Sequence, residues 1–68
     1  MLKEIQQLKF LHEEIGVSNK SLGKYCHCSG ASIGRYIKGE MIPTDQGLWC
    51  IQVGIQHLVK DFREGMEM

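Results

Sequence analysis

The chain has 68 residues, of which 43% are hydrophobic and 24% are charged, and its formal net charge at pH 7 is zero. We expect residues 1–68 to form a single domain. Because a chain this short buries only about 60% of its unfolded surface, a dimer, a metal or a disulfide would help to stabilise it. No apolar run reaches the roughly 18 residues of a membrane span, and the N-terminus lacks the apolar core of a signal peptide. These features predict a cytoplasmic protein that has no membrane partner.

Residues 2–15 predict an amphipathic helix, because apolar side chains recur there with the helical period. Gly16 follows this pattern and suits the residue after a helix end, where a positive φ is easiest for glycine. We expect the core-facing side chains to be Ile5, Leu8, either Leu11 or His12, and Ile15.

Residues 18–39 predict two short helices, around residues 19–27 and 30–38, joined by a turn of about three residues. Ser18 and Ser29 precede them, and a serine hydroxyl at such a position accepts a hydrogen bond from an otherwise unpaired backbone N–H. Gly39 is the expected end of the second helix. We expect the inward-facing side chains of this segment to be Leu22, Cys26, Cys28, Ile33, Tyr36 and Ile37.

Residues 40–44 predict a loop around Pro43, and Thr44 is the expected N-cap of a last helix over residues 45–64. An apolar stripe runs along this helix at intervals of three and four residues. It consists of Leu48, Ile51, Ile55, Leu58 and Phe62, widened by Trp49, Cys50, Val53 and Val59. No strand pattern competes, so the expected fold class is all-α: a small bundle of four helices, or five if the last one breaks, with a long C-terminal helix.

The last helix admits two interpretations. If it is unbroken, it is about 30 Å long and exceeds what a three-helix head can cover, so its uncovered stripe would be a partner surface. The expected dimer interface is then Ile55, Leu58, Val59 and Phe62, in a two-fold homodimer. Alternatively, the helix kinks near Gly54 and folds back onto its own head.

Charge is segregated along the chain. Residues 18–39 contain Lys20, Lys24, Arg35 and Lys38 but no acidic residue, whereas all eight acidic residues lie outside this segment. A basic segment within a neutral chain indicates where a polyanion would bind.

A family resemblance is carried by residues 22–43, LGKYCHCSGASIGRYIKGEMIP. This segment resembles the helix-turn-helix of the lambda-repressor and Cro-like (xenobiotic-response-element) regulators, and the resemblance extends over roughly residues 5–56. Family members usually carry Ala at the position of Gly23 and Gly at the position of His27, where a left-handed backbone is expected at some cost to His. The residues that carry the match are Leu22, Gly23, Cys28, Ser29, Ile33, Arg35, Tyr36, Gly39 and Pro43.

The resemblance implies that helix 30–38 enters the major groove of DNA, with helix-turn-helix residues 18–39 as the binding unit. Arg35 would then bind guanine O6 and N7 in a bidentate way, and Ala31 would pack on a thymine methyl group. The implied base-reading residues are Ser29, Gly30, Ala31, Ser32 and Arg35. The implied phosphate-binding residues are Asn19, Lys20, Lys24 and Lys38.

The sequence Cys26-His27-Cys28 also admits a metal site, with His12, Cys50 or His57 as further ligands. We favour Cys26 and Cys28 as small core side chains, because free cysteine behaves as a hydrophobe and three cysteines do not form a disulfide framework. We therefore expect no metal and no cofactor. A catalytic Cys–His pair would lack a third orienting group and a pocket, so we do not expect an enzyme.

These features predict a bacterial or phage transcriptional regulator, a homodimer that binds double-stranded DNA at a palindromic operator and takes no small-molecule ligand. The alternative is a protein-interaction module of the same fold, such as an antirepressor or antitoxin-like partner, which acts through its C-terminal helix.

Overall fold

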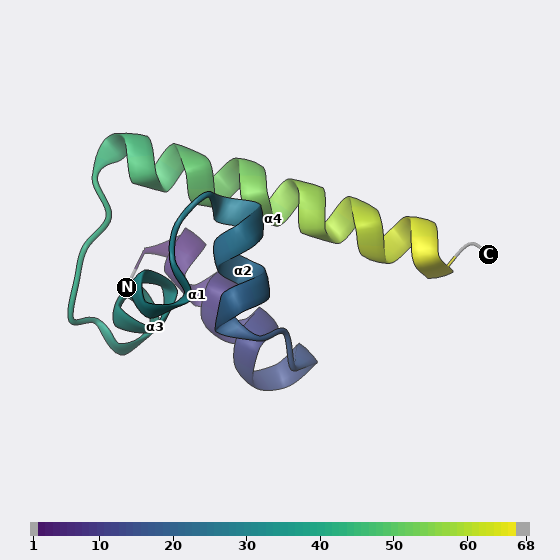
Figure 1. Cartoon of the computed structure of the whole chain (residues 1–68), viewed down its shortest axis with the longest axis horizontal. Helices are drawn as coiled ribbons and strands as arrows, with labels where there is room; N and C mark the ends of the chain where they lie inside the picture. The colour runs from purple at the N-terminus through teal and green to yellow at the C-terminus, as the bar shows by residue number, and fades with distance from the viewer. Residues whose placement is uncertain (1, 67–68) are drawn as a thin grey trace.

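A computed structural model describes residues 2–66 and is all-helical, which confirms the expected fold class (Figure 1). Residues 1, 67 and 68 of the predicted domain lie outside this range. No strand occurs in the described residues. The elements in chain order are α1 (Lys3–Phe10), the π-helical turn η1 (Leu11–Ile15), α2 (Asn19–Cys26), α3 (Gly30–Lys38) and α4 (Asp45–Met66).

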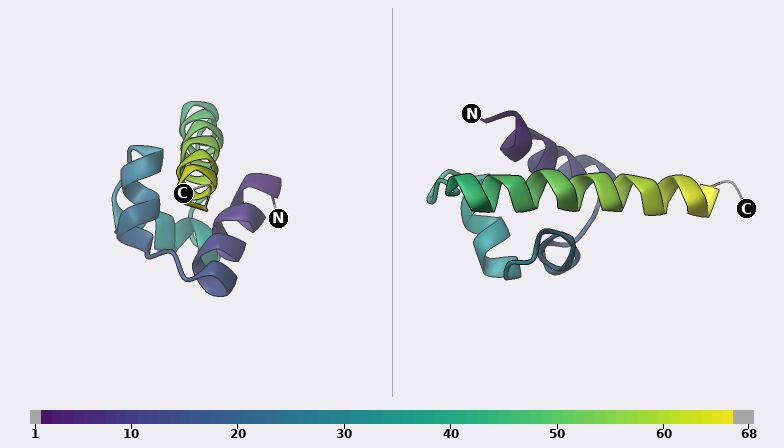
Figure 2. Two further views of the ribbon diagram at one scale, coloured as in Figure 1. Left: turned by 90° about the vertical axis from the view of Figure 1, so that its right-hand side faces the viewer. Right: turned by 90° about the horizontal axis from the view of Figure 1, so that it is seen from above.

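Helices α1, α2 and α3 form a head beneath one part of α4, and the C-terminal half of α4 projects beyond it (Figures 1 and 2). The molecule is consequently elongated, with extents of 38 × 22 × 20 Å. Polar contacts tie α4 to the head, and the shortest are two hydrogen bonds between side chains. Gln52 Nε2 donates to Glu4 Oε2 of α1 at 2.8 Å, and the Tyr25 hydroxyl of α2 donates to Asp61 Oδ2 at 2.5 Å.

The hydrophobic core lies where the four helices meet. Its four largest fully buried side chains come one from each α-helix: Leu8, Leu22, Ile33 and Ile51. Because every helix contributes one, no helix can leave without opening the core, which makes the small head a single packing unit. Ile5, Leu11, Cys26 and Leu58 complete the buried set.

The predicted helix 2–15 is interrupted at its C-terminal end. Its last five residues form the wider turn η1, and the Val17 N–H donates to the Leu11 carbonyl at 3.0 Å. Leu11 is the core residue of this turn, whereas His12 is half-buried and its Nδ1 donates to the Val17 carbonyl oxygen at 2.8 Å. The expectation that Ile15 faces the core is wrong: the widened turn rotates it outward, and it is 50% exposed. Gly16 ends the segment with φ +91°, as expected.

Helix α4 is continuous from Asp45 to Met66, so the predicted long helix is confirmed and the kink near Gly54 does not occur. Gly54 instead lies where α4 crosses α2. A Cβ at this position would lie 2.6 Å from the Tyr25 carbonyl oxygen and 2.7 Å from Cys26 Sγ. The glycine is therefore needed for the close approach of two helices and leaves the helix axis unbroken.

The apolar stripe of α4 is divided between the core and the surface. Leu58 is buried in the chain's own core, which corrects its assignment to a dimer interface, and Ile55 packs partly against that core. Trp49 does not widen the buried stripe, because it is 62% exposed. Val59 and Phe62, the other two expected interface residues, are exposed on the projecting half. Within the described residues, no helix combines the length and the apolar character needed to cross a membrane.

Candidate nucleic-acid interface

The unit formed by α2, a turn and α3 is built by local sequence signals. The Ser18 and Ser29 hydroxyls accept hydrogen bonds from the backbone N–H groups of Ser21 and Ser32, both at 3.1 Å, and so cap the two helices as expected. Gly39 ends α3 in the left-handed region with φ 79°. The predicted bounds hold for the second helix, and the first ends one residue earlier, at Cys26.

The turn between the two helices spans residues 27–29 and is closed on Gly23. The Cys28 N–H donates to the Gly23 carbonyl at 2.9 Å, and a Cβ at Gly23 would lie only 2.5 Å from the Cys28 carbonyl oxygen. The lambda-repressor and Cro-like regulators that this segment resembles usually carry alanine at this position. An alanine here would push the turn away from α2. His27 takes the left-handed conformation, φ 57° and ψ 41°, that the sequence predicts at this position.

One face of α3 is open to solvent. Ala31, Arg35 and Lys38 are all exposed, and their spacing of four and three residues puts them on the same side of the helix. The Arg35 guanidinium has no hydrogen bond or ion pair with any other residue in the range 2–66. This face therefore presents one small side chain and two cations that are free to bind an external ligand.

The two serines of the predicted site are already partly engaged. The Ser29 hydroxyl donates to the Ser32 hydroxyl at 3.0 Å while it accepts the backbone N–H of Ser32. Ser29 is exposed and Ser32 is half-buried. Both hydroxyls therefore stabilise the start of α3. Only the lone pair or proton that each hydroxyl does not use in these bonds is available to a ligand.

Gly30 and Asn19 lie between the helices. A Cβ at Gly30 would meet the backbone of Asn19 and Lys20 at 3.2–3.3 Å, so the missing side chain lets α2 approach α3 and does not clear the outer surface. The Asn19 side chain lies against Gly34 of α3, and its Oδ1 is buried with no hydrogen-bond partner in the described chain. Both residues are half-buried and pack α2 against α3, and their contacts with a base and a phosphate stay predictions.

The remaining predicted phosphate ligands are on the surface. Lys20 and Lys24 are exposed and one helical turn apart on α2. The contact of Gly30 with the backbone at Lys20 puts the beginning of α3 beside the beginning of α2. Figure 2 shows that α2 and α3 cross at a steep angle, and both helices carry exposed cations.

The three cysteines gather behind the turn. Cys26, Cys28 and Cys50 line one small hollow of about 230 Å³ together with His27, and all three are free thiols. Burial raises the pKa of Cys26 to about 11 and also raises that of Cys28, so both thiols are protonated at neutral pH. Cys26 is buried as expected, but Cys28 is only half-buried. In the described residues, no group of three His, Cys, Asp or Glu side chains is arranged to hold a metal ion.

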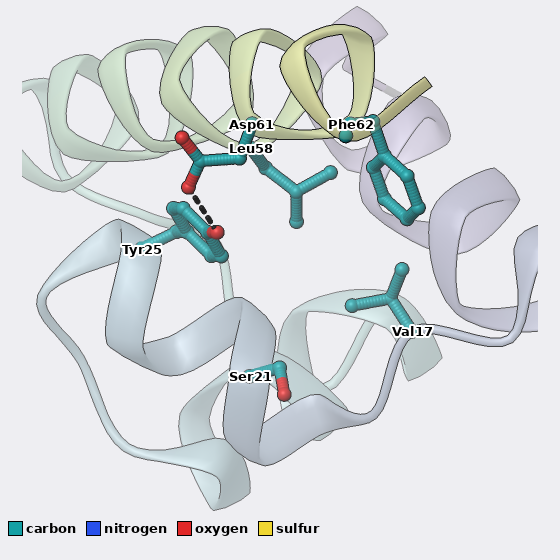
Figure 3. A pocket seen from close by; sticks show the side chains of 7 residues that line it. Val17, Ser21, Tyr25, Leu58, Asp61 and Phe62 are labelled. Atoms are coloured by element: carbon teal, nitrogen blue, oxygen red, sulfur yellow. Dashed lines mark hydrogen bonds between the residues drawn. The ribbon is translucent and has the colours of Figure 1, made fainter. Parts of the chain in front are cut away.

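A contact that the sequence did not reveal joins α2 to the projecting part of α4. Figure 3 shows the Tyr25 hydroxyl bonded to Asp61, with Phe62 on the same helix above Val17. The hydrogen bond to the Asp61 carboxylate raises the pKa of Tyr25, because an ionised tyrosine would face that negative charge. The partners are 36 residues apart, and no periodicity in the sequence links them.

No protein-family model, no curated protein and no solved structure matches the chain.

Proposed function

We propose that the chain is a sequence-specific DNA-binding protein that inserts α3 into the major groove and acts in the cytoplasm as a transcriptional regulator. The observation that carries the proposal is the open face of α3, where Ala31, Arg35 and Lys38 are exposed and Arg35 is unpaired within the described residues. Lys20 and Lys24 on the adjoining helix add positive charge next to that face. The proposal also extends the resemblance of residues 22–43 to lambda-repressor and Cro-like regulators.

In this mechanism, α2 lies across the phosphate backbone and α3 reads base edges. Lys20, Lys24 and Lys38 bind phosphates and determine the docking position without reading sequence. Arg35 binds guanine O6 and N7, and Ala31 contacts a thymine methyl group. Because Gly30 and Asn19 are used in packing α2 against α3, sequence preference rests mainly on Arg35, with smaller contributions from Ala31 and Ser32.

Selection of binding sites from a random-sequence duplex library, followed by equilibrium binding to the enriched site, tests the proposal. We expect Arg35→Ala to lose discrimination at one base-pair position by about 1–3 kcal/mol, or roughly 5- to 150-fold in affinity ratio. Arg63→Ala, which removes the same side chain from α4, is the matched control and should keep the wild-type preference. A preserved preference in Arg35→Ala would disprove the assignment of α3 as the reading helix.

A second candidate is a protein-interaction module, favoured by the exposed apolar side chains Val59 and Phe62 on the projecting half of α4. The same selection from a random-sequence duplex library distinguishes the two candidate functions. An interaction module enriches no DNA sequence, whereas a DNA-binding protein enriches one that Arg35→Ala no longer distinguishes.

A further inference from the structure

The fold brings three thiols together from two segments that are far apart in the sequence. Cys26 ends α2 and Cys28 lies in the turn before α3, whereas Cys50 lies on α4. All three line a single hollow of about 230 Å³, and all three are free. The turn that precedes α3 and the first half of α4 therefore present their thiols to the same small space.

The side of α4 that carries Cys50 is turned toward the other helices. Gly47 and Gly54 lie three residues before and four residues after Cys50, so the three positions share one side of α4. A Cβ at Gly54 would lie 2.7 Å from Cys26 Sγ at the end of α2. A Cβ at Gly47 would lie 3.8 Å from the Tyr36 hydroxyl of α3. Because Cys50 is between these two contacts, it faces the space that the turn between α2 and α3 spans.

The three thiols differ in how a reagent can reach them. Cys28 and Cys50 are half-buried, and a hollow needs only about 15 Å³ to hold a water molecule, so this larger one admits a small reagent. Cys26 is 2% exposed, and its Sγ is 4.0 Å from the Ile51 carbonyl oxygen. A thiol buried in this way packs as a small apolar side chain and is inert. The reactive pair is therefore Cys28 and Cys50.

The electrostatics of the hollow also connect Cys28 to Cys50. Burial raises the pKa of Cys28, and the neighbouring Cys50 raises it further, because two thiolates close together repel each other. The hollow thus disfavours a pair of thiolates. A disulfide between the same two residues carries no charge and is free of this repulsion.

We propose that Cys28 and Cys50 form an oxidation site, at which a low-molecular-weight disulfide converts the two thiols into one intramolecular disulfide. One protein thiolate attacks a sulfur of the reagent, which forms a mixed disulfide and releases the first reagent thiolate. The other protein thiolate attacks the protein sulfur of the mixed disulfide and releases the second reagent thiolate. The chain loses two electrons and two protons, and the reagent is reduced to two thiols.

This bond would attach the turn before α3 to α4. Cys28 directly precedes Ser29, the N-cap of α3, so oxidation would fix the start of this helix against α4. The bond would also close a loop that contains α3, and such a loop restricts the unfolded chain more than the folded one. The oxidation occurs on the protein alone and does not depend on the proposed function.

Thiol–disulfide exchange of the full chain in a buffer of 2-mercaptoethanol and hydroxyethyl disulfide tests the pairing. After an acid quench, tandem mass spectrometry of the peptides should identify one disulfide per chain, between Cys28 and Cys50, with Cys26 reduced. Cys28→Ser and Cys50→Ser should form no internal disulfide. Cys26→Ala, which removes the third thiol, is the matched control and should keep the bond. A wild type with no internal disulfide, or with a dominant one that includes Cys26, would overturn the proposal.

A second measurement determines whether the bond fits the native fold. The equilibrium constant for the Cys28–Cys50 disulfide should be at least about tenfold larger in the folded chain than in the chain unfolded in urea. The oxidised chain should accordingly unfold at a higher urea concentration than the reduced chain. Equal constants, or a lower urea midpoint after oxidation, would contradict the inferred placement of the two thiols. DNA selection with both forms is a separate readout, so failure of oxidation and failure of DNA binding remain distinguishable.

Discussion

At the scale of single residues, His27 introduces local backbone strain into the turn between α2 and α3. It is the one non-glycine residue in the range 2–66 with a positive φ, and it begins the turn that orients α3 relative to α2. An L-residue in the left-handed region costs roughly 1–2 kcal/mol, although His tolerates it better than most. This conformation is expected from the sequence, because the lambda-repressor and Cro-like family that residues 22–43 resemble usually carries glycine at this position.

We therefore expect His27→Gly to raise the free energy of unfolding by up to about 1 kcal/mol, since the strain relieved exceeds the additional chain entropy lost on folding. The exposed side chain has little packing to lose. Lys24→Gly is the matched control, because it places glycine at an exposed right-handed position in α2 and should lower stability by about 0.7 kcal/mol. Urea unfolding measures both variants. An equal loss of stability in His27→Gly and Lys24→Gly would show that the backbone of residue 27 is not strained.

At the scale of elements, two close approaches determine how the helices are placed. Gly23 lets the turn fold back onto α2, and Gly54 lets α4 cross α2 at the level of Tyr25 and Cys26. Glycine inside a helix is destabilising by itself, so its presence in the interior of α4 indicates a packing requirement. A break in the helix and a close crossing both account for a glycine in a helical pattern, and only the three-dimensional placement of α2 distinguishes them.

Two glycine-to-alanine substitutions in α4 test this crossing. Gly54→Ala should lower the free energy of unfolding by about 1–3 kcal/mol, because its Cβ would overlap the Tyr25 carbonyl and Cys26 Sγ. Gly65→Ala has no atom within 4 Å of its Cβ and should be neutral or stabilising by up to about 1 kcal/mol. Thermal or urea unfolding gives both values. A Gly54→Ala variant as stable as Gly65→Ala would mean that the helices are not in close contact there.

At the scale of the whole molecule, a chain of zero net charge carries half of its lysines and arginines in one segment that has no acidic residue. Lys20, Lys24, Arg35 and Lys38 are all exposed, and they belong to the segment that lacks acidic residues. Local charge, more than net charge, determines the affinity for a polyanion, because phosphates within a Debye length of about 8 Å interact with the nearest cations.

DNA affinity should fall steeply as salt increases, because each neutralised phosphate releases about 0.9 counterion. Lys24→Ala should reduce the slope of log affinity against log salt by about one for each bound protomer, with a similar loss on every DNA sequence. Lys9→Ala, a substitution of an exposed lysine on α1, is the control and should leave the slope unchanged. An unchanged slope in Lys24→Ala would remove α2 from the proposed phosphate contacts.

The sequence by itself determined the helices and most of their ends, since caps, glycine stops and apolar periodicity act through neighbouring residues, but it did not predict the π-helical turn η1. Ser18, Ser29 and Gly39 behave as predicted for that reason. Only the tertiary structure decided which apolar residues are covered and which small residues are used in packing. Leu58 is buried in the core, while Phe62, one turn later, is exposed beside an open hollow that it lines together with Val17 of the head. Gly30 and Asn19 were expected to face DNA, but the crossing of α2 and α3 half-buries both of them. The Tyr25–Asp61 contact likewise depends on where two distant segments meet, and such distances are properties of the fold.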